Sequence, residues 1–326
     1  MRKLSVRHER FPIRGVFAIS RGSRTVQDVV VAEIEEGALR GRGECVPYPR
    51  YGESVDGVIA EIAARTDEIA TGLDRRSLQE AMPPGAARNA LDCAFWDLEA
   101  KRTGTPVWRL AGLPEPKPVV TAFTLSLASP EAMGQAAREN ANRPLLKIKL
   151  GGEGDLARLE AIRAEAPLAR LIVDANEAWT AETLPKLLPE MARLGASLVE
   201  QPLPAGRDEA LSRVSHPVPI CADESCHTSA DIEKLVGRYD VVNVKLDKTG
   251  GLTEAIKLID AARAAKLGVM VGCMVGTSLS MAPATLLGDA ASFVDLDGPL
   301  LLAEDRPHGL RYADGRVFPP AAELWG

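Results

Sequence analysis

Residues Leu145 to Lys245 give the clearest indication of the fold, because they contain five short apolar runs that each end on an ionisable residue. The runs read Leu-Leu-Lys-Ile-Lys (145–149), Leu-Ile-Val-Asp (171–174), Ser-Leu-Val-Glu (197–200), Pro-Ile-Cys-Ala-Asp (219–223) and Val-Val-Asn-Val-Lys (241–245). Subtracting successive end positions gives spacings of 25, 26, 23 and 22 residues. Each spacing suits one strand, one helix and two loops. This rhythm predicts parallel strands that end at one edge of a sheet and bring the five side chains together there.

The same alternation extends beyond this stretch in both directions. Amphipathic stretches such as 155–165, 181–194, 252–266 and 277–287 separate apolar runs at 119–125, 145–150, 170–174, 196–200, 218–222, 241–245, 268–272 and 292–296. Parallel strands that are buried on both faces are almost uniformly apolar, as these runs are. Eight strands and seven intervening helices predict an α/β fold, a (β/α)7β TIM-like barrel over residues 116–303, with the active site at the strand C-terminal ends.

The N-terminal part has a different organisation. Three strands are predicted at Lys3–Arg10, Val26–Glu35 and Arg40–Val46, and helical periodicity follows, most clearly in Ala86–Lys101. Three prolines in Leu113–Pro118 mark the boundary with the barrel. We therefore predict an α+β capping domain over residues 1–115, which the tail 304–326 joins because it lacks the barrel rhythm.

Composition excludes several classes of function. The net charge is −6, and no dense block of basic residues favours nucleic acid or a membrane surface as a partner. No apolar run approaches the length of a membrane span, and the basic N-terminus has no apolar core behind it. The five cysteines are scattered without a Cys-x-x-Cys pair, which favours buried thiols in a cytoplasmic protein. The sequence leaves open whether the protein forms a homo-oligomer.

Three of the five ionisable residues are acids on consecutive predicted strands: Asp174, Glu200 and Asp223. A single acid at such a position would as readily cap the following helix, but three in succession favour a shared task. Carboxylate oxygens without His or Cys suit Mg²⁺ better than zinc. We therefore predict that the three acids hold one Mg²⁺ ion.

The other two ionisable residues are Lys149 and Lys245, which the barrel would carry to opposite sides of the acids. Lys147 points the same way as Lys149 because side chains alternate along a strand, and we expect it to give electrostatic support. A neighbouring ammonium is expected to lower the pKa of a lysine toward the range useful for a base. Two bases on opposite faces of a carbon, beside a Lewis acid, predict removal and return of a proton next to a carboxylate, hence racemisation or epimerisation.

These residues carry a family resemblance. The motifs Lys147-Ile-Lys149, Asp174-Ala-Asn176, Glu200-Gln-Pro202, Asp223-Glu-Ser225 and Lys245-Leu-Asp-Lys-Thr-Gly-Gly251 resemble those of the muconate-lactonising branch of the enolase superfamily. The resemblance covers nearly the whole chain. It implies a capped barrel and one Mg²⁺ ion per active site, with lysine bases. Asn176 and Glu224, next to metal ligands, are expected to support them.

Further residues indicate a substrate class. Asp295-Leu-Asp297 resembles the Asp-x-Asp signature of dipeptide epimerases, which binds a free α-amino group. Arg24, or else Arg21, would bind a side-chain carboxylate, and Cys273 stands on the seventh strand, near the substrate. Such a site is complementary to L-Ala-Glu. The resemblance implies epimerisation of L-Ala-D-Glu and L-Ala-L-Glu at the glutamyl α-carbon, as in recycling of cell-wall (murein) peptide.

Several alternatives stay open at this point. A different dipeptide specificity, a cycloisomerase or an o-succinylbenzoate synthase would share the fold, although the substrates of the last two carry no ammonium group for Asp295 and Asp297. Acid-sugar dehydration typically uses a histidine where Cys273 stands. A Schiff-base aldolase would not need three metal carboxylates, and a non-catalytic peptide-binding barrel would not need both Lys149 and Lys245.

Overall fold

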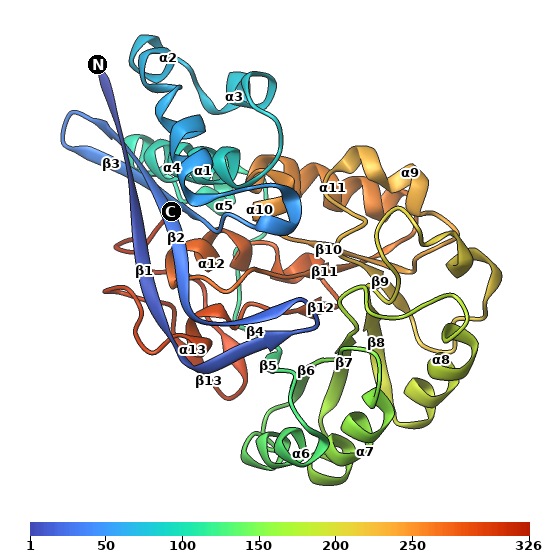
Figure 1. The fold of residues 1–326 in the computed structure, drawn as a ribbon. Helices are drawn as coiled ribbons and strands as arrows, with labels where there is room; N and C mark the ends of the chain where they lie inside the picture. The colour runs from blue at the N-terminus through green and yellow to red at the C-terminus, as the bar shows by residue number, and fades with distance from the viewer.

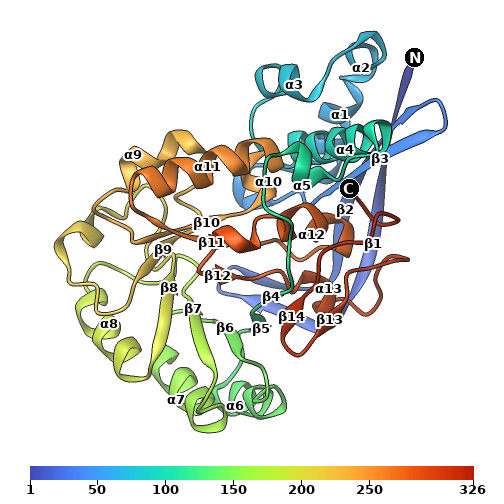
Figure 2. The ribbon, with the colours of Figure 1, turned by 180° about the vertical axis from the view of Figure 1, so that it is seen from behind.

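The computed structural model describes residues 1–326 and has an N-terminal α+β part packed on a barrel (Figures 1 and 2). The N-terminal sheet is antiparallel in the order β1-β2-β3, and its core includes Ile34, Leu91 and Phe95. Its strands are β1 (Arg2–Ile19), β2 (Gly22–Glu36) and β3 (Leu39–Cys45). Its helices are α1 (Val55–Ala63), α2 (Thr66–Thr71), α3 (Arg75–Ala81), α4 (Ala86–Thr103) and α5 (Val107–Leu110).

The β1–β2 hairpin differs from the sequence prediction, which ended the first strand at Arg10, began the second at Val26 and so left a loop between them. The two strands continue past a register irregularity between Pro12 and Phe17 and pair until Ile19 meets Gly22. The predicted loop is therefore the tip of a long hairpin. Figure 1 shows this hairpin crossing from the N-terminal part to the barrel mouth. The Ala18 carbonyl accepts a backbone hydrogen bond from Leu127, which attaches the tip to the barrel.

The barrel prediction is confirmed. Eight parallel strands follow one another in the order β5 to β12. They are β5 (Phe123–Leu125), β6 (Leu145–Lys149), β7 (Arg170–Asp174), β8 (Ala196–Glu200), β9 (Ile220–Ala222), β10 (Val241–Val244), β11 (Gly268–Val271) and β12 (Phe293–Val294). The two edges meet, because Ala122 N, next to β5, donates a hydrogen bond to Val294 O of β12 at 2.8 Å.

The connections depart from the prediction of seven intervening helices. Most contain an α-helix, but residues between β8 and β9 form only a 3-10 turn, Glu209–Arg213, because Pro204, Gly206 and Pro217 leave too little helix-forming sequence there. The α-helices of the connections are α6 (Pro130–Glu139), α7 (Asp155–Glu165), α8 (Leu184–Arg193), α9 (Ile232–Leu235), α10 (Leu246–Thr249), α11 (Leu252–Ala264) and α12 (Ser278–Thr285); α13 (Gly298–Leu301) follows β12. The predicted first strand, 119–125, is also split into β4 (Val119–Val120) and β5.

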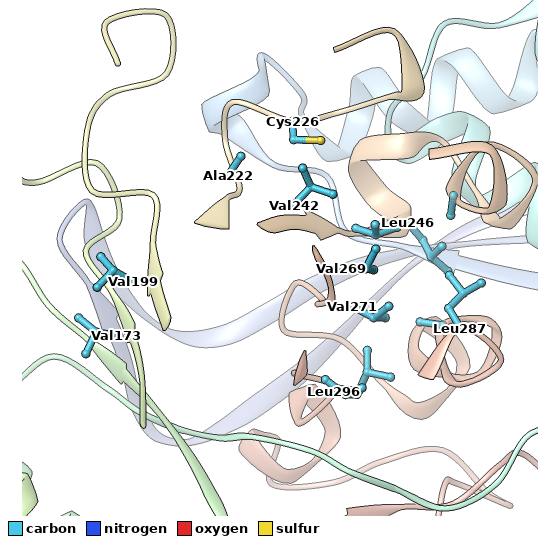
Figure 3. Close-up of a cluster of buried hydrophobic side chains, with 14 of the residues drawn as sticks. Val173, Val199, Ala222, Cys226, Val242, Leu246, Val269, Val271, Leu287 and Leu296 are labelled. Carbon is cyan, nitrogen blue, oxygen red and sulfur yellow. The ribbon is translucent and has the colours of Figure 1, made fainter. Parts of the chain in front are cut away.

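Alternation along the strands builds the barrel in layers. One apolar residue from each of the eight strands or its immediate flank fills the lower interior: Ala122, Leu145, Ile172, Leu198, Cys221, Val241, Met270 and Phe293. Residues between these positions point outward, as Val173, Val199 and Val242 do in Figure 3, and they belong to one apolar cluster with helix residues such as Leu159 and Leu188. Two positions further along the strands, the interior residues are mostly polar: Thr124, Lys147, Asp174, Glu200, Asp223, Asn243, Gly272 and Asp295. A layer of apolar side chains therefore fills the barrel interior below the polar layer at the barrel mouth.

The C-terminal tail connects the two parts. Its strands β13 (Tyr312–Ala313) and β14 (Arg316–Val317) form a small sheet with β4. At the end of the chain, buried Trp325 donates its indole N–H to Cys93 O of α4 at 3.0 Å. The tail therefore contacts both parts, and its assignment to the capping domain stays a prediction. None of the helices combines the length and the apolar character that crossing a membrane would require.

Candidate active site

Strand register places the catalytic candidates in one row at the barrel mouth. Lys149 of β6 pairs with Asp174 of β7, and Asp174 pairs with Glu200 of β8. Asp223 and Lys245 directly follow β9 and β10, the next two strands of the sheet. Strands β6 and β10 are four steps apart in a closed sheet of eight, so Lys149 and Lys245 approach the three acids from opposite sides.

Each of the three acids is buried and contacts a lysine. Lys149 Nζ lies 2.6 Å from Asp174 Oδ2, and Lys245 Nζ lies 2.6 Å from Asp223 Oδ2. Lys147 Nζ lies 2.8 Å from Glu200 Oε2 and 3.3 Å from Asp174 Oδ2. The lysines thus supply the positive charge that buried carboxylates need in a medium of low dielectric constant.

These contacts shift the pKa values of the acids in different directions. Burial alone would raise the pKa of Asp174, but Lys149 and Lys147 outweigh it and hold this pKa at about 2. The pKa of Asp223 is lowered in the same way, because Lys245 and Lys248 oppose the effect of burial. Burial and the charge of Asp174 raise the pKa of Glu200. The three carboxylates form one coupled electrostatic unit.

The expectation that a neighbouring ammonium would lower a lysine pKa is wrong for this arrangement. Burial and Lys147 act to lower the pKa of Lys245, but the Asp223 carboxylate outweighs them and raises it. The pKa of Lys147 is raised as well, because Asp295, Glu200 and Asp174 oppose burial. The direct carboxylate contacts dominate because Coulomb energy falls with distance and these contacts are the shortest.

The residues fit a hard cation by their chemistry. Eight buried side-chain polar atoms in the protein lack a hydrogen-bond partner, and five of them are acceptor oxygens of this site: Asn176 Oδ1, Glu200 Oε2, Glu224 Oε2, Asn243 Oδ1 and Asp295 Oδ1. Unsatisfied buried acceptors are costly, and a cation relieves that cost. While the lysines contact the acids, no three His, Cys, Asp or Glu side chains are arranged so that they could bind a metal ion together. Asp174, Glu200 and Asp223 would hold Mg²⁺ once Lys149 and Lys245 leave Asp174 and Asp223.

A cavity of about 530 Å³ opens above this layer, between the barrel mouth and the β1–β2 hairpin. The predicted substrate-binding residues Arg24, Cys273, Asp295 and Asp297 all line it, together with Lys147, Lys149 and Lys245. Apolar side chains from the hairpin, Phe17 and Ile19, complete the wall. The structure therefore brings together every residue that the sequence assigned to substrate or proton transfer.

The two aspartates after β12 have separate partners. Asp295 Oδ2 accepts a hydrogen bond from Lys147 Nζ at 2.8 Å, so its charge is largely compensated. Asp297 Oδ2 accepts one from the backbone N–H of Thr124 at 2.6 Å. Burial and the nearby Asp295 raise the pKa of Asp297 to about 7. Asp297 is therefore the acid that remains without a cationic partner.

The structure distinguishes the two arginines that the sequence left open. The Arg21 guanidinium is occupied, because it lies 2.7 Å from Glu224 Oε1 and 3.2 Å from Glu177 Oε2 and donates to Asn176 O. Arg24 makes no ion pair and stacks over the Phe17 ring at 5.5 Å. Burial lowers the pKa of Arg24, because the nearby Tyr48 and Asp28 do not offset the loss of solvent. Arg24 is therefore the arginine available to an anionic ligand.

Of the two predicted supporting residues, Asn176 contacts one of the acids, and both Asn176 and Glu224 bind the hairpin tip. The Asn176 backbone N–H donates to Asp174 Oδ1 at 3.0 Å, and the Asn176 carbonyl receives bonds from Ser20 and Arg21 at the hairpin tip. Asn176 adopts a left-handed backbone conformation with φ 46°. Burial and the charge of Asp223 raise the pKa of Glu224 to about 7.

Sequence reasoning missed three polar residues that support the acids. Asn243 Nδ2 donates to Glu200 Oε1 at 2.7 Å, and Gln201 Oε1 accepts from the backbone N–H of Asp223 at 2.8 Å. Lys248 Nζ donates to Asp223 Oδ1 at 2.7 Å. The available signal was a polar side chain within or directly after an apolar strand, as in the run Val-Val-Asn-Val that contains Asn243.

Gly272 provides a test of this support. A Cβ at Gly272 would lie 2.5 Å from Asn243 Oδ1 and 2.8 Å from Asn243 Nδ2. We expect Gly272→Ala to push the amide away from Glu200 and to lower kcat/KM about 10- to 100-fold, equivalent to the loss of one hydrogen bond to a charged group. Activity assays at saturating Mg²⁺, with thermal unfolding as a check on folding, measure this effect.

Gly268→Ala on the same strand is the matched control. Its Cβ would meet Val241 Cγ2 at 3.1 Å, away from the acids. We expect a change in stability of about 1–3 kcal/mol at most and little change in kcat/KM. Equal losses of activity in the two variants would contradict the assignment of Asn243 as a support for Glu200.

The fold and the site together define a class: a capped barrel enzyme with buried acids set between two opposed lysines. Comparisons with known proteins agree. The family described as "Mandelate racemase / muconate lactonizing enzyme, N-terminal domain" matches residues 1–112, and "Enolase C-terminal domain-like" matches residues 132–323. The chain belongs to this mandelate racemase/muconate lactonizing enzyme family of the enolase superfamily.

Individual relatives are epimerases and racemases, that is, isomerases. The chain is 47% identical to the L-Ala-D/L-Glu epimerase of Escherichia coli over 97% of this chain and 99% of that protein. It is 45% identical to the N-acetyl-D-glutamate racemase of a Pseudoalteromonas species, over 91% of this chain and 95% of that protein.

Solved structures extend the comparison. An enolase family member from Agrobacterium tumefaciens, with homology to dipeptide epimerases and with bound sodium and L-Ala-L-Glu, is 55% identical over 100% of both chains, with a TM-score of 0.98. A dipeptide epimerase from Enterococcus faecalis, in complex with Mg and L-Leu-L-Tyr, is 30% identical over 99% of this chain and 98% of that chain, with a TM-score of 0.91. Magnesium in that relative agrees with the cation that suits Asp174, Glu200 and Asp223.

Proposed function

We propose that this protein epimerises L-Ala-D-Glu and L-Ala-L-Glu by moving the glutamyl α-proton between Lys149 and Lys245. The observation that carries the proposal is the position of these two amines on opposite sides of three buried acids, at the floor of a cavity that also contains Arg24 and Asp297. A planar carbon held between two bases can lose its proton to one face and regain it from the other. The configuration at that carbon is then inverted.

Each residue of the site has a chemical task in this reaction. Mg²⁺ bound by Asp174, Glu200 and Asp223 would stabilise negative charge on the glutamyl α-carboxylate and, by neutralising Asp223, remove the interaction that raises the pKa of Lys245. One lysine accepts the α-proton while the other, as an ammonium, returns a proton to the opposite face. Lys147 stays charged between Asp295 and Glu200, and its positive charge stabilises the same developing negative charge.

Two charged residues of the cavity wall support the dipeptide substrate. Arg24 has an uncompensated guanidinium that would bind the glutamyl side-chain carboxylate in a bidentate manner. Asp297 has no cationic partner and would accept the α-ammonium of the alanyl residue. The relatives that act on or bind Ala-Glu dipeptides support this choice of substrate.

We further propose a cytoplasmic role in recycling Ala-Glu dipeptides from cell-wall (murein) peptide. The five cysteines are all free, which suits a reducing compartment. The substrate chemistry supports the role, because a mixed L-Ala-D-Glu unit must be converted to the L,L form before ordinary peptidases can hydrolyse it.

Solvent deuterium wash-in tests the proposal. The purified protein with Mg²⁺ in heavy water should convert L-Ala-L-Glu to a mixture with L-Ala-D-Glu and place deuterium at the glutamyl α-carbon alone, as followed by proton NMR. Turnover without label, or label at the alanyl α-carbon, would contradict proton transfer between the two lysines at the assigned carbon.

Racemisation of an N-acylglutamate is a second candidate, favoured by one observation. The pKa of Asp297 is raised to about 7, so at neutral pH a large fraction of this carboxyl is protonated and able to donate a hydrogen bond to an acyl oxygen. The N-acetyl-D-glutamate racemase relative points to the same chemistry. Direct comparison of kcat/KM for L-Ala-L-Glu and N-acetyl-L-glutamate decides between the two, and a higher value for the latter would replace the dipeptide as the substrate.

Arg24→Met tests the assignment of the anionic end. We expect kcat/KM for L-Ala-L-Glu to fall about 10- to 100-fold, mostly through KM, because a hydrogen-bonded charge contact contributes about 1.5–3 kcal/mol. L-Ala-L-Gln is the control substrate, since it has nearly the same shape without the charge. We expect its kcat/KM to change by no more than about threefold. A similar loss on both dipeptides would show that Arg24 maintains the hairpin rather than binding the carboxylate.

A further inference from the structure

Lys248 is a buried cation that the proposed reaction does not use. Its side chain has 0% exposure, on the short helix α10 behind the cavity floor. Its Nζ donates to Asp223 O at 2.5 Å, to Asp223 Oδ1 at 2.7 Å and to Asn243 O at 2.9 Å. An ammonium has three N–H donors, so all of them are satisfied and the group is fixed in place.

The two oxygens of Asp223 are thus bound by different lysines. Oδ2 contacts Lys245, which lines the cavity and makes no other hydrogen bond. Oδ1 contacts Lys248, which is also held by two backbone carbonyls. The proposed reaction requires Lys245 to leave its acid, whereas Lys248 would have to break three hydrogen bonds in a buried environment to do the same.

The segment that contains Lys248 is itself held rigidly. Helix α10 ends at Thr249 and is followed by Gly250 and Gly251, which have φ angles of 75° and 114°. A Cβ at Gly250 would lie 2.4 Å from Arg88 Nε, and Arg88 donates to the carbonyls of Thr249 and Gly250. The helix is therefore fixed against the N-terminal part, and Lys248 cannot withdraw by a movement of its backbone alone.

We infer that Lys248 is a positioning residue that keeps Oδ1 of Asp223 occupied, so that this acid offers only Oδ2 to a metal ion. The inference rests on the proposed metal site. Mg²⁺ requires a small octahedral set of ligands, whereas Ca²⁺ takes six to eight oxygens and accepts both oxygens of one carboxylate. By restricting Asp223 to one oxygen, Lys248 favours Mg²⁺ over Ca²⁺.

The test compares two lysines that contact the same acid. Calorimetric titration of metal-free protein, without substrate, gives the dissociation constants for Mg²⁺ and Ca²⁺ in the wild type, Lys248→Met and Lys245→Met. Both variants remove one positive charge beside Asp223, so charge alone affects them alike. We expect the Ca²⁺ to Mg²⁺ ratio of dissociation constants to fall about tenfold or more in Lys248→Met. It should change less than about twofold in Lys245→Met.

Other outcomes overturn the inference in distinguishable ways. If the Ca²⁺ to Mg²⁺ ratio of dissociation constants stays constant in both variants, or falls equally in both, the contact of Lys248 with Asp223 Oδ1 has no specific role in metal selectivity. Wild-type protein that binds neither cation would refute the metal site of the proposed function itself. If Lys248→Met does not fold, a crystal structure of the wild type with Mg²⁺ tests the inference instead. Asp223 should then bind the ion through Oδ2 alone, while Oδ1 still accepts the hydrogen bond from Lys248. Binding of the ion by both oxygens of Asp223 would refute the inference.

Discussion

Lys149→Met and Lys245→Met are each expected to abolish epimerisation of both L-Ala-D-Glu and L-Ala-L-Glu, with losses of about 10⁴-fold or more in kcat, since each removes a general acid–base group. Epimerisation needs both amines, because one removes the α-proton and the other returns a proton to the opposite face. Exchange of the α-proton with solvent needs only the base on the side where that proton lies. Each variant should therefore still exchange the α-proton of one epimer.

The two variants are expected to retain exchange with opposite epimers, and this pattern is the decisive measurement. Proton NMR in heavy water follows loss of the α-proton from L-Ala-L-Glu and from L-Ala-D-Glu separately. Lys186→Met, at an exposed position on α8, is the matched control and should behave like the wild type. Two variants that exchange the same epimer would place both amines on one face and refute the proposed mechanism.

Glu200→Gln is expected to lower kcat at least about 10³-fold and to weaken Mg²⁺ binding. Glu200 lies at the centre of the row, between Asp174 and Asp223, and the only contact of its buried Oε2 is the Lys147 ammonium at 2.8 Å. The amide keeps the shape but removes the charge that would hold the cation. Lewis-acid stabilisation of developing charge contributes several kcal/mol to such reactions, so its loss is as damaging as loss of a base.

Thermal unfolding gives a readout that is independent of activity. Wild-type protein should be stabilised by about 2.7 kcal/mol at a Mg²⁺ concentration 100 times the dissociation constant, and the same Mg²⁺ concentration should stabilise Glu200→Gln much less. Chelator should abolish wild-type activity, and added Mg²⁺ should restore it. Glu182→Gln, which changes an exposed acid, is the control for the loss of one negative charge. Full wild-type activity in the presence of chelator would refute the metal site.

Most of the barrel could be predicted from the sequence because its strands are buried on both faces. Their side chains alternate between the interior and the helices, so the position of Glu200 two residues after Leu198 fixes its direction toward the barrel axis. The connection between β8 and β9 was predicted wrongly as a helix, because average spacing alone does not separate a helix from a turn when Pro204 and Pro217 interrupt the segment.

Pairings between distant segments could not be predicted. The sequence favoured Arg24 but left Arg21 open, and only the tertiary structure shows that Arg21 is bound by Glu224, 203 residues away, while Arg24 makes no ion pair. The pKa expectation for the lysines failed for the same reason. A neighbouring ammonium was visible in the motif Lys147-Ile-Lys149, whereas the stronger contact of Lys245 with Asp223 depends on the packing of two strands.

The sequence by itself determined the layered barrel, the three acids and the opposed lysines, because strand periodicity and strand order fix the direction and the angular position of each side chain. Tertiary structure alone decided which ion pairs form: Asp295 with Lys147, Arg21 with Glu224, and Lys248 with Asp223. The physical reason is that a contact between charges depends on distances of a few ångströms between separate elements. The local sequence pattern predicts the direction of a side chain, but the packing of separate elements determines which residues that side chain contacts.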